Sequence, residues 1–283
     1  PLPHPPPHIV RTPPRVLKQL ATGTVDLATL HTSVLDEAYR MLHKGLSAEL
    51  DAILKFVPAK RQTLLFSATY PDAIAAISNK VQRDAIIIDV TDDEQAAHIT
   101  QYWCEVTREN RCADLLGTIR KWGGTLNLVF CNTKIDCADV AVYLKANGIV
   151  GLALHGDLDQ NQRNEVLVRF ANRSASVLIA TDVAARGLDV DDVDAVFNYE
   201  LPPQPEVYTH RIGRTARAGK KGLAVSLVEP REARRLLDIE AAQSEAIVRH
   251  PVPEPTGNND ALTPSMTTLQ ISGGRKNKLR PGD

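Results

Sequence analysis

The chain has 283 residues, of which 43% are hydrophobic and 24% are charged, and its formal net charge is -1. These values are ordinary for a soluble globular protein, and the length predicts about two domains, each large enough to bury a core. No run approaches the eighteen or so apolar residues of a membrane span, and no signal peptide is found, so we expect no membrane partner. The near-neutral total hides an acidic stretch at 182–200 and basic stretches at 211–221 and 273–280. A nucleic-acid partner is therefore not excluded.

The cysteines give no sign of a metal site. No Cys-x-x-Cys pair occurs, and no Cys–His spacing resembles a zinc site. The four residues are Cys104, Cys112, Cys131 and Cys137. We expect reduced thiols in a cytoplasmic protein, and Cys131 lies in an apolar run that predicts a core position.

Short apolar runs alternate with helical patterns through the first 90 residues. Strands are predicted at 33–35, 63–66 and 86–90. Helical spacing between them predicts helices near 46–56 and 72–81.

A second series of the same kind follows a polar break. Strands are predicted at 126–131, 151–154, 177–180, 195–199 and 223–228, with amphipathic helical spacing at 115–122 and 166–170. Continuous Val, Ile and Leu strands that alternate with helices imply a parallel sheet covered on both faces.

The predicted fold class is therefore α/β, with two parallel-sheet domains. After Glu245 the pattern dissolves into Pro, Gly and Asn, which is typical of a linker, and 266–271 then alternates like one strand. The predicted parts are a first, incomplete domain at 1–90, an interdomain linker at 91–98, a second domain at 99–245, a linker at 246–265 and the start of a further domain at 266–283.

The segment Val207–Gly219 carries the most specific signal. Arg211, Arg214 and Arg217 recur every three residues beside His210, so in a helical turn they would project from nearly one side. Three guanidiniums on one side repel each other unless a polyanion lies between them, and a nucleoside triphosphate is the obvious candidate. The alternative is a solvated basic helix face.

Two carboxylates and a Ser/Thr pair follow neighbouring strands. Asp36 and Glu37 end the strand at 33–35, and Ser67 and Thr69 follow the strand at 63–66. At the carboxyl edge of a parallel sheet, such carboxylates suit a magnesium ligand and a base that activates water. Asp-Glu after a strand is nevertheless common, and the Ser/Thr pair can equally cap the next helix.

Together these segments resemble the conserved motifs of the DEAD-box RNA helicase family. Asp-Glu-Ala at 36–38, Ser-Ala-Thr at 67–69, Ala-Thr-Asp-Val-Ala-Ala-Arg-Gly-Leu-Asp at 180–189 and the arginine segment at 210–217 occur in the family's order. Further matches lie at 130–134, 154–163 and 198–202, so the resemblance runs from about residue 9 to about residue 245. It implies two RecA-like domains that grip ATP and one RNA strand.

The resemblance also implies a role for each matching residue. Asp36 would hold Mg²⁺ through water, and Glu37 would orient and deprotonate the attacking water. The expected nucleotide-binding residues are Gly187, Asp189, Arg214 and Arg217, with Asp189 at the ATP ribose and the arginines at the γ-phosphate. The expected coupling residues between nucleotide and RNA are Ser67, Thr69, His210 and Tyr39. The expected RNA-binding residues are Thr12, Arg15, Gly156, Arg163, Thr181 and Asp182.

The tail narrows the resemblance to one branch of the family. Residues 268–283 resemble the first strand and basic loop of the RNA-binding domain of DbpA-type helicases, and Ala216 stands where most of the family has glycine. The implied partner is large-subunit ribosomal RNA in pre-ribosomal particles, and we expect a monomer.

Three departures from the family pattern matter. The sequence contains no Gly-x-x-x-x-Gly-Lys-Ser/Thr loop, which the family would have in front of residue 1, so we expect this chain to bind ATP poorly and to hydrolyse it at no useful rate. Tyr39 replaces the last aspartate of Asp-Glu-Ala-Asp, which predicts weakened coupling to RNA more than weakened hydrolysis. Pro14 replaces a glycine and removes an N–H that could meet a phosphate.

Two classes of function follow from these residues. The leading hypothesis is an ATP-dependent RNA helicase that remodels ribosomal RNA during large-subunit assembly. Its rival is a non-catalytic RNA-binding or ribosome-assembly factor derived from the family, which Tyr39 and Pro14 favour. A DNA helicase fits less well, because the motifs follow the RNA branch.

Overall fold

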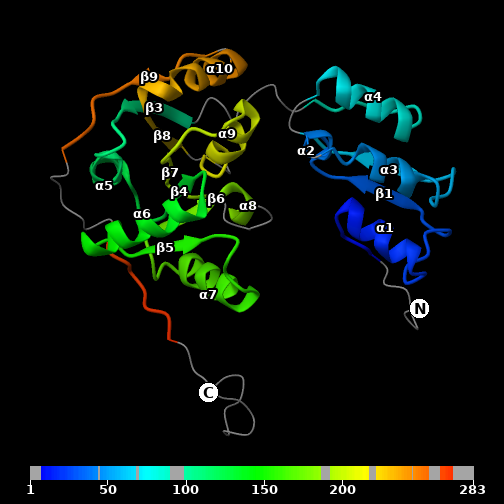
Figure 1. The fold of residues 1–283 in the computed structure, drawn as a ribbon, viewed down its shortest axis with the longest axis horizontal. Coiled ribbons are helices and arrows are strands. Elements are labelled where there is room, and N and C mark those ends of the chain that lie inside the picture. Colours follow the sequence, from blue (N-terminus) through cyan, green and yellow to red (C-terminus); the bar gives the residue numbers. More distant parts are fainter. Residues whose placement is uncertain are drawn as a thin grey trace, which may run out of the picture. The chain divides into compact units, whose positions relative to one another are not determined.

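The computed structural model describes residues 8–43, 45–67, 70–89, 99–185, 192–216, 221–243, 245–254 and 262–269. The chain divides into two compact units, Pro1–Val90 and Thr91–Asp283 (Figure 1). Among the helices of the described ranges, none has the length and apolar character needed to cross a membrane.

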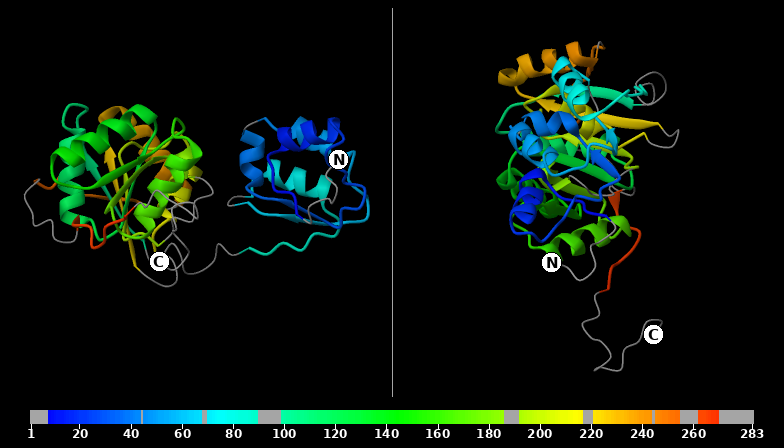
Figure 2. Two further views of the ribbon diagram at one scale, coloured as in Figure 1. Left: turned by 90° about the horizontal axis from the view of Figure 1, so that it is seen from below. Right: turned by 90° about the vertical axis from the view of Figure 1, so that its right-hand side faces the viewer.

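In its described residues, the first unit contains a two-stranded parallel sheet and four helices. Its elements are α1 (Pro13–Ala21), β1 (Thr32–Leu35), α2 (Ala38–His43), α3 (Ser47–Leu54), β2 (Gln62–Leu65) and α4 (Asp72–Val81). β1 runs parallel to β2 with Leu35 opposite Leu65, and the helices of this unit lie beside the two strands (Figure 2). Leu35, Leu50 and Val81 form a small core. The two strands and two helices lie close to their predicted bounds, so those predictions are confirmed.

The strand predicted at 86–90 is wrong for its described part. Residues 85–89 have no regular structure, and Ile86, Ile87 and Ile88 are 87%, 68% and 81% exposed. A strand needs a neighbour that completes its backbone hydrogen bonds, and a run of β-branched residues does not supply one. Val90 lies outside the described residues.

The second unit contains one parallel sheet in the strand order β5-β6-β4-β7-β8-β3-β9. Its strands are β3 (Ile99–Glu105), β4 (Asn127–Cys131), β5 (Gly151–Leu154), β6 (Val177–Thr181), β7 (Ala195–Asn198), β8 (Gly222–Val228) and β9 (Val248–Arg249). Its helices are α5 (Arg111–Trp122), α6 (Lys134–Ala146), α7 (Gln160–Ala171), α8 (Asp182–Ala185), α9 (Pro205–Ile212), the 3₁₀ helix η2 (Pro230–Glu232) and α10 (Ala233–Gln243). The five strands that the sequence predicts are confirmed, whereas β3 and β9 were not predicted.

Alternate residues of the interior strand β4 face different cores. Val129 packs in a cluster with residues of α5 and α6, whereas Leu128 and Phe130 pack in another with Phe170 of α7. A third cluster joins Ala224 of β8 to α9 and α10. Helices thus cover both faces of the sheet, as its continuous apolar strands predict.

Beyond β9 the chain stays on the second unit instead of leaving it. We call residues 250–254 and 262–269 the C-terminal strap. His250 N donates to Trp103 O at 2.8 Å, and Leu262 is 4% exposed within the core of α5 and α6. Thr268 Oγ1 is 2.8 Å from both Asn172 Nδ2 and Ser174 Oγ.

The strap corrects two sequence expectations. The linker predicted at 246–265 contains β9 and the buried Leu262, so its described residues belong to the second unit. The strand predicted at 266–271 is absent from its described residues, 266–269, which have no regular structure. Proline and glycine indicated a lack of regular structure, but not whether the segment packs.

The close packing of the strap on α5 gives a testable prediction for Gly117. A Cβ on Gly117 would lie 2.4 Å from the carbonyl oxygen of Pro253. We expect Gly117→Ala to lower the free energy of unfolding of the second unit by about 1–3 kcal/mol, because overpacking against backbone outweighs the gain in helix propensity. Both tryptophans, Trp103 and Trp122, lie in this unit, so urea unfolding followed by their fluorescence measures it.

Cys104 gives a second readout of the strap. Its Sγ lies 4.0 Å from Pro251 O, and burial raises its thiol pKa to about 11, so native Cys104 should resist iodoacetamide. Gly117→Ala should speed its alkylation. Gly156→Ala is the matched control for stability, since a Cβ there meets no atom within 4 Å. An unfolding free energy that rises in Gly117→Ala would show that the strap is not held there.

Candidate functional site

In the first unit, the two predicted motif segments meet at the carboxyl edge of the sheet. Phe66 N donates to Leu35 O at 2.8 Å, and Ala38 N donates to Phe66 O at 3.0 Å. These bonds tie the chain after β1, which carries Asp36 and Glu37, to the chain after β2. The parallel pairing that apolar strands predict therefore brings the backbone of Asp36 and Glu37 close to the segment that carries Ser67.

Glu37 has a backbone conformation that its sequence gives no reason to expect. Its φ is 51°, in the left-handed region that residues other than Gly, Asn and Asp rarely adopt. Glu37 N donates to Asp36 Oδ1 at 2.9 Å, and the next residue, Ala38, is fully buried. Strained residues of this kind cluster at functional sites, where the surrounding structure holds them in place.

The predicted coupling segment is described only in part. Ser67 Oγ is shielded from solvent and has no hydrogen-bond partner within the part of the chain that the structure describes. Tyr39 is half-buried in the first turn of α2. Thr69 lies outside the described residues.

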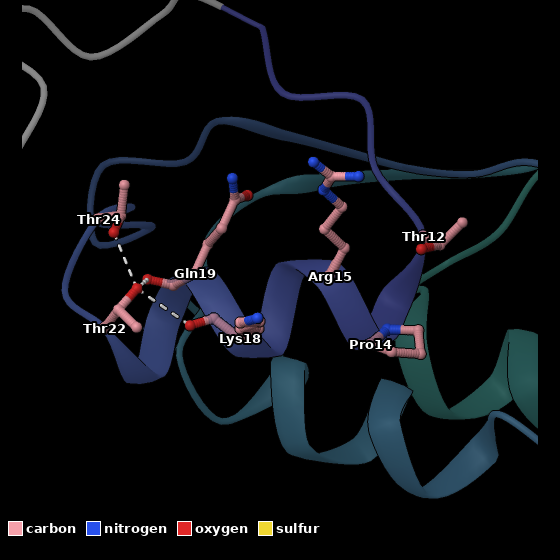
Figure 3. Close-up of a pocket in the computed structure, with 7 residues that line it drawn as sticks. All are labelled: Thr12, Pro14, Arg15, Lys18, Gln19, Thr22 and Thr24. Atoms are coloured by element: carbon pink, nitrogen blue, oxygen red, sulfur yellow. Dashed lines mark hydrogen bonds between the residues drawn. The ribbon is translucent and has the colours of Figure 1, made fainter. Parts of the chain in front are cut away.

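The predicted RNA residues Thr12 and Arg15 line one groove on α1 (Figure 3). Its volume is ≈ 670 Å³, and its other lining residues are Pro14, Lys18, Gln19, Thr22 and Thr24. Thr12 is the N-cap but its side chain makes no capping bond, and Pro13 and Pro14 fill the first two helix positions. Sequence reasoning missed Lys18 and Gln19, although the spacing i, i+3, i+4 from Arg15 would have indicated them.

In the second unit, Arg211 lies at the centre of a buried polar network at the carboxyl edge of the sheet. Its guanidinium donates to both carboxylate oxygens of Asp182, at 2.8 and 2.9 Å. It also donates to Asn132 Oδ1 at 2.8 Å, Asn198 Oδ1 at 3.2 Å and Glu200 O at 2.7 Å. Arg211 is 1% exposed, so this network joins the ends of β4, β6 and β7 to α9.

The expectation that three arginines project from one side of a helix is wrong. α9 ends at Ile212 with Gly213 as its C-cap, so Arg214 lies in the turn beyond it. Arg211 turns inward because a bidentate carboxylate and three further acceptors satisfy its donors. Arg217 lies outside the described residues, and His210 is in the last turn of α9.

A second buried network lies beside the first and was missed in the sequence. Arg111, 3% exposed, pairs with Glu229 at 3.2 Å, with Glu200 at 3.7 Å and with Glu232. Burial raises the pKa of the Glu200 carboxyl. Glu200 Oε2 also accepts from Asn132 N at 3.0 Å, which links the two networks. The partners are spread over more than 100 residues, so no local pattern could have shown them.

The predicted RNA residues of this unit gather around the ends of β5 and β6. Leu154 lies opposite Ala180 in these parallel strands, so Gly156 and Asp182 each stand two residues beyond the pairing. Arg163 donates to Ala184 O at 3.0 Å, and Thr181 Oγ1 accepts from Ala184 N at 3.4 Å, so both hold α8 in place. Both Asp182 oxygens meet Arg211, so any RNA contact of Asp182 shares its carboxylate with this pair.

Gly156 is open, because a Cβ there would meet no atom within 4 Å. His155 beside it has a buried Nδ1 that meets no hydrogen-bond partner in the described residues. The predicted nucleotide residues Gly187 and Asp189 lie outside the described residues.

The carboxylates of the first unit fit a magnesium ion that is held mainly by water. Asp36 and Glu37 are both exposed at the sheet edge. Among the described residues there is no group of three or more His, Cys, Asp or Glu that could hold a metal ion alone. Mg²⁺ keeps several waters and is usually bound by one or two carboxylates together with phosphates, which suits this pair.

These parallel α/β units, with paired motif segments at their carboxyl edges, define a RecA-like helicase fold, and comparison with known proteins agrees. The DEAD/DEAH box helicase family matches residues 2–77, and the helicase conserved C-terminal domain matches residues 108–219. The chain belongs to the DEAD-box RNA helicase family.

Individual relatives support this assignment. The chain is 47% identical to the ATP-dependent RNA helicase DbpA of Escherichia coli over 282 residues. This alignment covers 100% of this chain and 62% of the relative. It is 42% identical to the DEAD-box ATP-dependent RNA helicase CshA of Geobacillus kaustophilus, over 86% of this chain and 52% of the relative. S. cerevisiae Dbp5 bound to RNA and ADP BeF3 matches with a TM-score of 0.73 and 32% identity, over 86% of this chain and 65% of that one. The chain thus spans about half to three fifths of these two curated relatives.

Proposed function

We propose that the protein is an ATP-dependent RNA helicase, an RNA-stimulated ATP hydrolase that remodels ribosomal RNA. The observation that carries the proposal is the pairing of β1 with β2, which holds Asp36 and Glu37 beside Ser67 at one sheet edge. Membership of the DEAD-box family and the relatives with this activity support it.

The proposed hydrolysis uses residues of both units. Glu37 orients the attacking water and takes its proton, and Asp36 holds Mg²⁺ through water. A bound Mg²⁺ supplies charge neutralisation at the phosphates. Arg214 and Arg217 stabilise charge on the transferred phosphoryl group, and Gly187 and Asp189 bind the nucleotide. Ser67, Thr69, His210 and Tyr39 couple the nucleotide to the RNA.

RNA is proposed to lie on residues of both units, contacted mainly at phosphates and 2′-hydroxyls. These residues are Thr12, Arg15, Gly156, Arg163, Thr181 and Asp182. The 47% identity to a DbpA supports large-subunit ribosomal RNA in pre-ribosomal particles as the partner. We further propose that the protein is a monomer and that it is located in the cytoplasm.

Phosphate release by the complete gene product tests the activity. Release is measured without RNA, with single-stranded RNA and with a large-subunit ribosomal RNA hairpin. We expect strong stimulation by RNA, and stronger stimulation by the hairpin supports the ribosomal target. No turnover alongside intact RNA binding would contradict the helicase.

That last outcome would favour a non-catalytic RNA-binding or assembly factor. Two observations favour this second candidate: Tyr39 has no carboxylate for the coupling contacts, and the prolines at the start of α1 remove backbone donors. Tyr39→Asp in the complete product should increase duplex unwinding more than basal hydrolysis if only coupling is weakened. Equal gains, or none, would count against this role of Tyr39.

A further inference from the structure

The groove on α1 extends beyond the two residues assigned to RNA. Arg15, Lys18, Gln19 and Thr22 stand at i, i+3, i+4 and i+7, so they form one stripe about 10 Å long on the helix (Figure 3). Arg15 and Lys18 are both exposed, and the lining has no carboxylate. Neither cation has an ion pair within the described chain. Two unpaired cations on one polar groove suit a chain of phosphates.

The far end of the groove is fixed by local hydrogen bonds. Thr22 Oγ1 meets Lys18 O and Gln19 O, each at 3.1 Å, and Thr24 Oγ1 at 2.8 Å. Thr24 N also donates to Gln19 O at 3.0 Å. These bonds hold the backbone at the helix end that carries Lys18 and Gln19, so we expect little backbone ordering on binding.

Gln19 has an unmet hydrogen-bonding need at this position. Its Oε1 is shielded from solvent and has no hydrogen-bond partner among the described residues, which is unfavourable for a buried acceptor. Its amide lies on the same side of α1 as the Arg15 guanidinium in Figure 3. Rotation of the terminal amide, a broad torsion, turns Oε1 toward the groove and lets it accept from a hydroxyl.

We propose that the α1 groove binds the nucleotide next to that held by Arg15, with Lys18 on its phosphate and Gln19 accepting from its 2′-hydroxyl. This inference rests on the proposed RNA binding of Thr12 and Arg15. The 2′-hydroxyl is the donor that DNA lacks, so Gln19 gives the groove a preference for RNA.

Lys18 is tested through the salt dependence of binding. The 283-residue chain is titrated onto a fluorescent uridine decamer and onto the matching deoxyuridine decamer between 50 and 300 mM KCl, with affinity read by anisotropy. Lys18→Gln should make the slope of log affinity against log salt shallower by about 0.7 for both strands, because one phosphate contact is lost. Lys55→Gln, which removes an exposed charge of the same unit outside the groove, should leave the slope unchanged.

Gln19 is tested through the ratio of RNA to DNA affinity. Gln19→Met keeps the length of the side chain and removes the acceptor, so RNA affinity should fall about fivefold, one net hydrogen bond, while DNA affinity stays constant. Gln62→Met is the control, because Gln62 is exposed at the start of β2 and does not line the groove.

The outcomes separate this inference from the proposed function. If the unaltered chain binds RNA and Arg15→Gln weakens it, but Lys18→Gln and Gln19→Met behave like their controls, the inference is wrong and RNA binding stands. Equal losses for RNA and DNA in Gln19→Met would contradict the 2′-hydroxyl contact. A chain that binds neither strand would overturn both.

Discussion

Arg211→Met should destabilise the second unit by about 3–5 kcal/mol, because it leaves a buried ion-pair partner and three further acceptors unsatisfied. Methionine keeps much of the side-chain volume, so the loss is chiefly one of hydrogen bonds and charge. Asp182, whose side chain is only 21% exposed, has no other ion pair in the described chain. Urea unfolding followed by Trp103 and Trp122 fluorescence gives the free energy.

Arg169→Met is the matched control. Arg169 on α7 is 36% exposed and pairs with Glu165 at 3.8 Å across one helical turn. Exposed pairs of this kind contribute about 0.3–0.5 kcal/mol, so the control should change little. If Arg211→Met costs no more than Arg169→Met, the Arg211 network does not hold the strand ends together.

The structural role of Arg211 has a consequence for function. Because α9 is anchored through Arg211, the positions of His210 and Arg214 depend on that anchor. Loss of activity in Arg211 variants would therefore follow from the displaced segment, without direct contact between Arg211 and nucleotide.

Glu37 should show opposite effects on stability and on hydrolysis. In the complete gene product, Glu37→Gln and Glu37→Gly should both lower the rate of ATP hydrolysis by about 10²–10⁴, the contribution of a general base, with RNA binding kept. Only Glu37→Gly relieves the φ of 51°, so it should stabilise the edge of the first unit by up to about 1 kcal/mol after its entropic penalty. Hydrogen exchange at the Ala38 and Phe66 amides, which bond across this edge, measures that gain.

The two variants control each other. Glutamine keeps the size of the side chain and the strained backbone, so amide protection in Glu37→Gln should match the unaltered protein. Substantial hydrolysis by Glu37→Gln would rule out Glu37 as the base. Equal protection in the two variants would show that the left-handed conformation carries no strain.

Strand positions were readable from the sequence where the sheet is complete. The five strands predicted in the second unit are confirmed because each is a short, mainly apolar run that is largely buried, from the fully buried β4 and β7 to β5, where half-buried and buried residues alternate. The same pattern failed at 86–90, where Ile86–Ile88 are exposed. β3 was missed because its seven residues include polar Thr100, Gln101 and Glu105.

The sequence predicted the candidate site residues as a set of motifs, but it did not predict the contacts and burial of each residue. Asp36 and Glu37 follow β1 as predicted, and parallel pairing brings the segment after β2 beside them. The sequence could not show that Glu37 takes a left-handed φ or that Ser67 Oγ lacks a hydrogen-bond partner among the described residues. Nor could it distinguish Arg211, buried against Asp182, from Arg214, two positions that are chemically identical in the motif.

The sequence by itself determined the family, the alternation of strands and helices, and which residues reach the carboxyl edges of the sheets. Local periodicity suffices for these, because side-chain direction repeats every two residues in a strand and about every 3.6 in a helix. Only the tertiary structure decided which polar group meets which. Arg211 forms hydrogen bonds with Asp182, Asn132 and Asn198, which are 13–79 residues away in the sequence. The strap packs on α5 although more than 100 residues separate the two in the sequence. These partners come from the ends of different strands, which only the folded sheet brings together. A buried charge is stable only where such partners surround it.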